Sequence, residues 1–241
     1  MRTNAQPLIL ELLILIAHMQ CTSESIIERG GDMKSTAFLV VIILGMCSQE
    51  ARSQVAPVNT GLGDCIDFII YASPTLTGQV NSTPYSFAYS SSSYLDKANG
   101  VVYVQNFTCN PQSPDLPGIY SRVSQVSHEM GHANFDASFP LGTREDYIEK
   151  ACTNEGRAVL NNATARSEIL NTSEGYSDIG LAAANSGALL TLINAGGQNL
   201  DKRVGDLFCD TNVTSTTGVN YKVHWGNVYD ELYGPEDEEE Q

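Results

Sequence analysis

The sequence predicts an α+β fold in which a small β-sheet precedes a helical second half. Three observations lead to this class. Residues 100–107 (GVVYVQNF) are β-branched and aromatic, which is typical of a strand. Residues 119–134 carry apolar side chains in steps of three and four, which indicates a helix with one buried face. After residue 145 the chain has mostly helical composition, including a stretch rich in alanine and leucine.

The first half contains four predicted elements. Residues 64–72 (DCIDFIIYA) are an apolar run that predicts a first strand. Residues 73–93, rich in Ser, Thr, Tyr and Pro, predict a loop or an irregular hairpin. The strand at 100–107 and the helix at 119–134 follow. Pro117 lies just before this helix, where helices commonly begin.

The second half is predicted to be helical throughout. Residues 146–170 have helical composition, and residues 176–195 predict a buried helix that packs behind the functional site. Residues 201–208 predict a short helix. Residues 223–233 predict a last helix, which carries the only tryptophan, Trp225.

Residues 128–132 (HEMGH) form a complete HExxH motif within the helix predicted at 119–134. Residues four apart lie on the same face of a helix, so the imidazoles of His128 and His132 can reach one metal ion. Glu129 lies about 100° further around the helix. Its carboxylate is therefore expected beside the metal, where it can accept a proton from a coordinated water. The motif is the zinc-binding core of many metallopeptidases.

Catalytic zinc usually has three protein ligands, so a third ligand is expected elsewhere. The metzincin pattern HExxHxxGxxH is excluded, because Phe135 and Ser138 stand at its Gly and His positions. Residues 154–158 (NEGRA) instead resemble the second-helix NEGxA motif of the gluzincins, especially of their aminopeptidase branch. The resemblance covers these two motifs only, and the 22 residues between His132 and Glu155 are slightly more than that family usually has. It implies a zincin-like fold in which Glu155 is the third zinc ligand.

Other carboxylates near the motif are alternative ligands, with Glu149 the first of them after Glu155. The side chain of Glu155 is expected to point inward, because Cys152 and Val159 lie on the same helix face. A buried carboxylate needs a partner, and a metal ion is a strong one. The remaining candidates have ordinary interpretations, as a solvated or capping residue or as first-turn acids of a helix: Asp136, Glu145 and Asp146.

A residue that stabilises the oxyanion of the transition state is expected late in the chain. Zincins often use a His or Tyr hydrogen-bond donor for this purpose. His224 is the candidate, with Tyr221 and Tyr229 as alternatives. The competing interpretation is that His224 is a surface or packing residue beside Trp225.

The N-terminal part has the pattern of a targeting sequence. Residues 33–53 combine a basic start, an apolar run at 37–46 and small residues near the end, which predicts a secretory signal peptide. Met46 is too large for the lipobox that Cys47 would require in a lipoprotein. Residues 1–32 are interpreted as a doubtful upstream extension. The apolar runs of both segments are shorter than the roughly 20 residues that span a bilayer.

A single metallopeptidase-like domain is predicted at residues 54–234, followed by an acidic, disordered tail at 235–241. From Gln54 onward the chain has 9 basic and 23 acidic residues. Such a charge disfavours nucleic acid and anionic membranes as partners. The four cysteines of this part predict two disulfides formed in an oxidising compartment, with all three pairings open: Cys65, Cys109, Cys152 and Cys209. A secreted or periplasmic location follows.

The function implied by the motifs is zinc-dependent hydrolysis of peptide bonds. One Zn²⁺ would be held by His128, His132 and Glu155, with Glu129 as the general base. The strand at 101–107 is expected to offer a free edge to an extended peptide or protein substrate. A loose similarity to metallopeptidase domains of bacterial secreted effectors and polymorphic toxins makes cell-wall peptides a candidate substrate. The alternative is a non-catalytic secreted binding protein with a structural or degenerate site, against which the intact Glu129 argues.

Overall fold

The computed structural model describes residues 57–135 and 142–234. They form a three-stranded sheet and seven helices, which confirms the predicted α+β class. The upstream extension at 1–32, the signal peptide at 33–53, the acidic tail at 235–241 and Asp136 lie outside the described residues.

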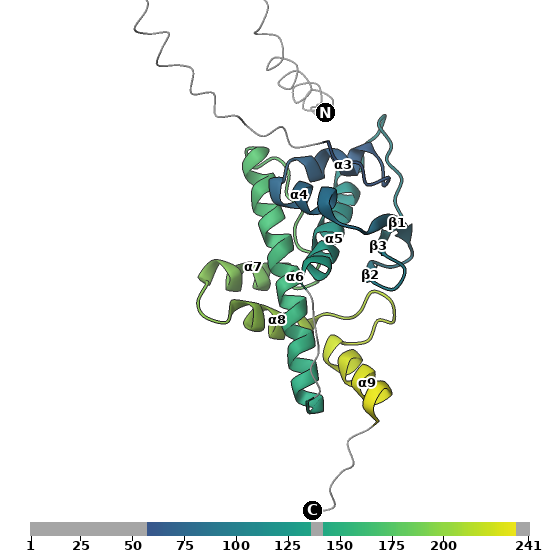
Figure 1. The fold of residues 1–241 in the computed structure, drawn as a ribbon. Coiled ribbons are helices and arrows are strands. Elements are labelled where there is room, and N and C mark those ends of the chain that lie inside the picture. The colour runs from purple at the N-terminus through teal and green to yellow at the C-terminus, as the bar shows by residue number, and fades with distance from the viewer. Residues whose placement is uncertain (1–56, 136–141, 235–241) are drawn as a thin grey trace, which may run out of the picture. The chain divides into compact units, whose positions relative to one another are not determined.

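The elements follow one another along the chain with two helices before the sheet and five after it (Figure 1). In order they are α3 (Asp64–Tyr71), α4 (Pro74–Ser82), β1 (Ser86–Ser90), β2 (Tyr94–Asp96), β3 (Val101–Gln105), α5 (Leu116–Asn134), α6 (Arg144–Thr172), α7 (Ser186–Ala195), α8 (Leu200–Thr211) and α9 (Tyr221–Tyr233). None of the described helices is long and apolar enough to cross a membrane.

The first predicted strand, at 64–72, is wrong, because these residues form helix α3. Its buried side chains are Ile66, Ile69 and Ile70, whose spacing of three and four residues is that of a helix. A short apolar run does not distinguish a strand from a helix by itself. The deciding signal was the acidic residues Asp64 and Asp67 in the first turn, where they favour the positive end of a helix.

The prediction of a loop or irregular hairpin at 73–93 is also only partly right. Helix α4 begins with the Ser73 side chain, which accepts a hydrogen bond from the Leu76 backbone, and Pro74 occupies the first helical position. Both are standard start signals for a helix. Strand β1 follows α4 within the same stretch.

Strand β3 lies in the middle of the sheet. Strand β1 pairs with it in parallel and strand β2 pairs with it antiparallel. Both edges of β3 are therefore occupied, and the expectation that residues 101–107 offer a free edge to a peptide is wrong. The error arose because both neighbouring strands come from residues 86–96, which the sequence did not resolve as strands.

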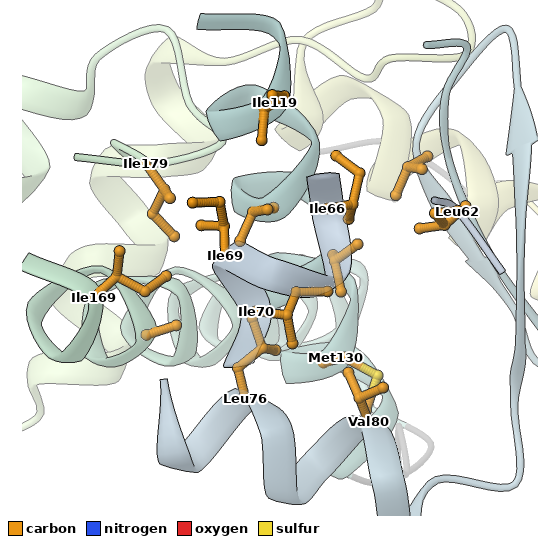
Figure 2. Packing of buried hydrophobic residues seen from close by; sticks show 14 of the residues in the cluster. Leu62, Ile66, Ile69, Ile70, Leu76, Val80, Ile119, Met130, Ile169 and Ile179 are labelled. Carbon is orange, nitrogen blue, oxygen red and sulfur yellow. The ribbon is translucent and has the colours of Figure 1, made fainter. Parts of the chain in front are cut away.

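The main hydrophobic core lies between α3, α4, the sheet and the two long helices (Figure 2). Ile66 and Ile70 of α3 and Leu76 of α4 meet Met130 of α5 and Ile169 of α6, and all five are fully buried. Burying one such side chain contributes about 1.5–3 kcal/mol to folding. This core fixes α5 against α6, the two helices that carry the HExxH and NEGxA motifs.

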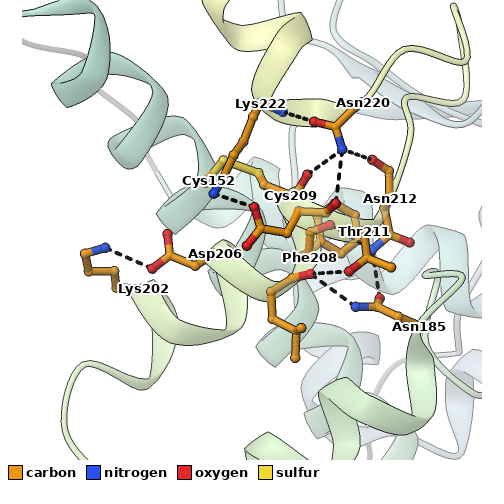
Figure 3. A network of polar contacts seen from close by, with 12 residues as sticks. Cys152, Asn185, Lys202, Asp206, Phe208, Cys209, Thr211, Asn212, Asn220 and Lys222 are labelled. Atoms are coloured by element: carbon orange, nitrogen blue, oxygen red, sulfur yellow. Dashed lines mark hydrogen bonds and ion pairs between the residues drawn. A yellow bond between two sulfur atoms is a disulfide. The ribbon is translucent and has the colours of Figure 1, made fainter.

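Two disulfides settle the pairing that the sequence left open. Cys65 of α3 is bonded to Cys109, after β3, with a Cα–Cα distance of 5.9 Å. Cys152 of α6 is bonded to Cys209 of α8, with a Cα–Cα distance of 5.8 Å (Figure 3). The second disulfide joins the helix that carries Glu155 to α8.

The buried helix predicted at 176–195 is shorter and more exposed than expected. Helix α7 begins only at Ser186, and Leu189 is its one buried residue. Residues 177–181 have no regular secondary structure. The helices predicted at 201–208 and 223–233 are present as α8 and α9, with slightly wider bounds.

The glycine of the NEGxA motif lets α6 and α8 touch through their backbones. A Cβ at Gly156 would overlap the carbonyl oxygen of Asp201 and lie 2.6 Å from the Gly205 nitrogen. Because both neighbours are backbone atoms, they cannot move without separating the helices. Overpacking of this kind typically costs about 1–3 kcal/mol.

We therefore expect Gly156→Ala to lower the free energy of unfolding by at least about 1–3 kcal/mol, because the added methyl group pushes α8 away from α6. Urea unfolding of both proteins measures this difference in the free energy of unfolding. Gly187→Ala in α7 is the matched control, since a Cβ there meets no atom within 4 Å. That substitution is expected to be neutral or slightly stabilising. Equal effects at the two positions would contradict the close packing of α6 on α8.

Candidate metal centre

Helix α5 holds the two histidines of the HExxH motif on one face. The helix begins at Leu116, and the carboxylate of Asp115 caps it by accepting from the Gly118 backbone. No proline interrupts it after Pro117, so the four-residue spacing places His128 and His132 one turn apart. His128 is buried, and the side chain of His132 is 15% exposed.

Helix α6 brings Glu155 to these histidines. The helix starts with a capping box between Thr143 and Asp146 and runs without a break to Thr172. Glu155 is buried on the same face as Cys152 and Val159, as the sequence predicted. The two helices approach closely at Gly131, where a Cβ would lie 2.5 Å from the Cα of Ala158. The small residues of the two motifs thus bring the motifs together.

His128, His132 and Glu155 converge on one point and could hold a metal ion. Oε2 of Glu155 lies 3.4 Å from Nε2 of His128 and 3.3 Å from Nε2 of His132. Both separations exceed the 2.7–2.9 Å or so of a charge-assisted hydrogen bond. Oε2 is buried and forms no hydrogen bond to the described residues. A buried carboxylate oxygen without such a bond, between two imidazole nitrogens, fits a site built for a cation.

The electrostatics of the group agree with this arrangement. Burial by itself raises the pKa of Glu155, but the neighbouring His132 and His128 outweigh burial and lower that pKa to about 2. Burial by itself lowers the pKa of His132, but the charge of Glu155 outweighs it and raises that pKa. The carboxylate is therefore ionised at neutral pH, which is the form that coordinates metals.

The side chain of Asn154 contacts Nδ1 of His132, the imidazole nitrogen other than the one nearest Glu155. The side-chain amide of Asn154 lies 3.1 Å from Nδ1 of His132, and its Oδ1 is buried without a partner among the residues that the structure describes. In the other orientation of the amide, Nδ1–H of His132 donates to Oδ1, and the amide nitrogen takes the position that has no partner among the described residues. That hydrogen bond leaves Nε2, the nitrogen nearest Glu155, free to bind a metal.

Glu129 lies beside the three candidate ligands and not among them. It is buried, and Oε1 accepts a hydrogen bond of 2.8 Å from the hydroxyl of Ser93. Ser93 immediately precedes β2. The sequence gave no indication of this contact, because Ser93 lies 36 residues away in a serine-rich stretch.

The rival ligands within the described residues lie elsewhere. Glu145 and Asp146 are in the first turn of α6, where Asp146 takes part in the capping box, as expected for first-turn acids. Glu149 is exposed and lies 3.6 Å from the ammonium of Lys202. In these positions, none of the three carboxylates belongs to the group that includes His128 and His132.

A cavity of about 780 Å³ opens onto the candidate metal centre. His128 and Glu129 line it, together with Ser93 and with Phe208 of α8, whose ring stacks on His128 at 5.6 Å between centroids. Tyr221 at the start of α9 also lines it. Burial, with the charges of Glu155 and Glu129 added, raises the pKa of Tyr221 far above its ordinary value. Its phenol is therefore protonated at all physiological pH values and able to donate a hydrogen bond.

His224 does not line this cavity. It lies on α9 one turn after Tyr221, partly buried, with its ring 4.9 Å from that of Trp225. This is the position described by the competing interpretation of a packing histidine. Tyr229, the other alternative, is buried further along α9 and donates its hydroxyl to the carbonyl of Gly142. Of the three candidate donors, Tyr221 is the one that faces the cavity.

No protein-family model, curated protein or solved structure matches the chain. The proposed function therefore rests on the geometry of the site.

Proposed function

We propose that this protein is a zinc-dependent peptidase of the gluzincin type, with His128, His132 and Glu155 as the metal ligands. The observation that supports it is the separation of the donor atoms. Zn–N bonds of about 2.0–2.1 Å and Zn–O bonds of about 2.0–2.2 Å place two ligands of a tetrahedral ion about 3.3 Å apart. The two nitrogen–oxygen separations in the group are 3.3 and 3.4 Å. Two imidazoles and one carboxylate are also a ligand set of catalytic zinc.

Zn²⁺ in this site would supply a Lewis acid that polarises a carbonyl and lowers the pKa of water. Glu129 would accept the proton of the attacking water and pass it to the leaving amine. Ser93 holds one oxygen of that carboxylate, which restricts its rotation. The second oxygen of Glu129 is then the one that exchanges the proton.

Tyr221 would donate a hydrogen bond to the oxyanion that forms when the carbonyl is attacked. Its place in the cavity wall and its protonated phenol support this role. His224, the residue that the sequence favoured, lies outside the cavity wall.

We expect Tyr221→Phe to lower kcat by about 10²–10³-fold, because it removes a hydrogen bond made mainly in the transition state. KM and the metal content should change little. His224→Ala is the matched comparison and is expected to change kcat only a few-fold. Steady-state kinetics on both variants decides between them. A large loss in His224→Ala together with normal turnover in Tyr221→Phe would return the donor role to His224.

The proposed substrate is an extended peptide outside the cytoplasm. Two disulfides support an oxidising compartment, hence secretion or a periplasmic location. Strand β2 is an edge strand of the described sheet, and Ser93 at its start touches Glu129. Strand β2 thus begins next to Glu129, and its outer edge replaces that of β3 as the candidate peptide-binding edge.

The experiment that tests the function is metal analysis of the purified protein together with a peptidase assay. One zinc per chain and cleavage of a mixed peptide library, both lost on treatment with a chelator and regained with zinc, support the proposal. Failure of the purified protein to bind zinc, even after dialysis against a zinc solution, would contradict the proposed function. Zinc without cleavage favours the alternative of a non-catalytic binding protein.

A further inference from the structure

Residues 178–184 form one wall of the cavity at the candidate metal centre. All seven of these consecutive residues line the cavity, although the segment belongs to no helix or strand. Helix α5 also lines the cavity with Ser121, Ser124 and Gln125, which lead along the helix to His128. Ser124 donates to the Gly180 carbonyl at 3.5 Å, so the segment lies against the helix at this point.

Side-chain amides hold this segment in place. Asn162 of α6 is fully buried, and its Oδ1 accepts from the Ala182 N–H at 2.8 Å. Oδ1 of Asn212 accepts from the Ala184 N–H at 2.7 Å. Asn212 is itself fixed, because it donates to Oδ1 of Asn185 and to the Phe208 carbonyl (Figure 3). The segment is thus rigidly anchored although no strand pairs with it.

Three N–H groups of the segment have no acceptor among the described residues, those of Asp178, Ile179 and Leu181, and Asp178 is exposed to solvent. The N–H groups of Gly180, Ala182 and Ala184 are bound by side chains. Those of Ile179 and Leu181 alternate with these bound groups. Both residues line the cavity, and less than a tenth of the surface of each is exposed. An N–H group without an acceptor in the protein binds water or the carbonyl oxygen of a bound molecule.

The length of the cavity suits a peptide. Pro117 and His128 of α5 both line it, and 11 residues of helix extend over about 16 Å. An extended peptide advances about 3.3 Å per residue, so about five residues fit along this wall. The small side chains of Gly180, Ala182 and Ala183 leave space for a main chain to approach closely.

We propose that residues 178–184 bind the main chain of the peptide substrate through the N–H groups of Ile179 and Leu181. The inference rests on the proposed peptidase function and adds the segment that binds the substrate, with several substrate residues bound on one side of the bond that is cut. Asn162 and Asn212 are positioning residues, because they hold the binding segment without touching the substrate.

Binding of hydroxamates to the zinc-loaded protein tests the proposal without measuring turnover. Acetohydroxamate needs the metal alone, whereas peptidyl hydroxamates extend along the cavity. Two series with one to four residues are compared by calorimetry, one extended on each side of the hydroxamate. We expect one series to gain at least tenfold in affinity between one and three residues.

Ala183→Phe should remove most of that gain, because its ring fills the space beside the wall, and should leave the affinity for acetohydroxamate unchanged. Ala183→Leu is a milder variant that keeps the test valid if the larger residue perturbs folding. Ala188→Phe on α7 is the matched control, since Ala188 is exposed and lies outside the cavity.

The outcomes separate the two proposals. If neither series gains affinity with length, or if the gain survives both Ala183 variants, residues 178–184 do not bind the substrate. If no hydroxamate binds to a protein that has taken up zinc, the proposed peptidase site itself is wrong.

Discussion

Glu129→Gln is expected to lower peptidase activity by at least about 10²–10⁴-fold while the metal content stays normal. Glutamine has nearly the shape of glutamate and can still contact Ser93, but it cannot take up the proton of the attacking water. The side chain lies beside the three candidate ligands and is not one of them. Removal of the base and loss of the metal are therefore separable at this position.

The measurement combines cleavage of a fluorogenic peptide library with elemental analysis of the same preparation. Glu145→Gln is the matched control, because Glu145 is an exposed glutamate in the first turn of α6. It should leave both activity and zinc unchanged. Full activity in Glu129→Gln would show that the base is another group, and the proposed mechanism would then be wrong.

The sequence was sufficient to predict the parts of the site that depend on local spacing. His128 and His132 are related by one helical turn, and Glu155 shares its face with Cys152 and Val159. The structure brings the three candidate ligands together because Gly131 and Ala158 allow α5 and α6 to touch. Local periodicity predicted which residues face inward, and the two motifs predicted which helices meet.

The parts that depend on tertiary contacts could not be predicted in this way. The hydrogen bond from Ser93 to Glu129 joins residues whose closeness no local pattern encodes. The cavity wall at 178–184 was mistaken for part of a helix, because its alanine-rich composition is helical. The N–H groups of Ala182 and Ala184 are bound instead by Asn162 of α6 and by Asn212, which follows α8. Side chains that compete for backbone groups in this manner override helix propensity.

The error at α3 has a different cause. A run of isoleucines next to an aromatic residue favours a strand by composition, whereas the buried positions follow the helical period. A separate stretch, residues 86–96, contains β1 and β2, which the sequence did not resolve as strands. For that reason β3 was expected to have a free edge.

Glu155→Ala is expected to weaken zinc binding strongly, because it removes a proposed ligand. The loss of affinity should exceed the 10–100-fold or so that results when a residue hydrogen-bonded to a metal ligand is replaced. The two histidines that remain cannot replace the carboxylate within the described site, since Oε2 of Glu155 is the oxygen that lies between them. Competition with a chromophoric chelator measures the dissociation constant. Circular dichroism of both proteins excludes unfolding as the cause.

Glu149→Ala is the matched control, because it removes a glutamate from the same helix at an exposed position paired with Lys202. It should bind zinc as tightly as the unaltered protein. Equal zinc affinities for Glu155→Ala and the unaltered protein would show that the third ligand is another residue, and the gluzincin proposal would fail at its second motif. Loss of zinc in Glu155→Ala but not in Glu149→Ala would support His128, His132 and Glu155 as the ligand set. The two glutamates are chemically the same, and they differ only in burial and in distance from the histidines.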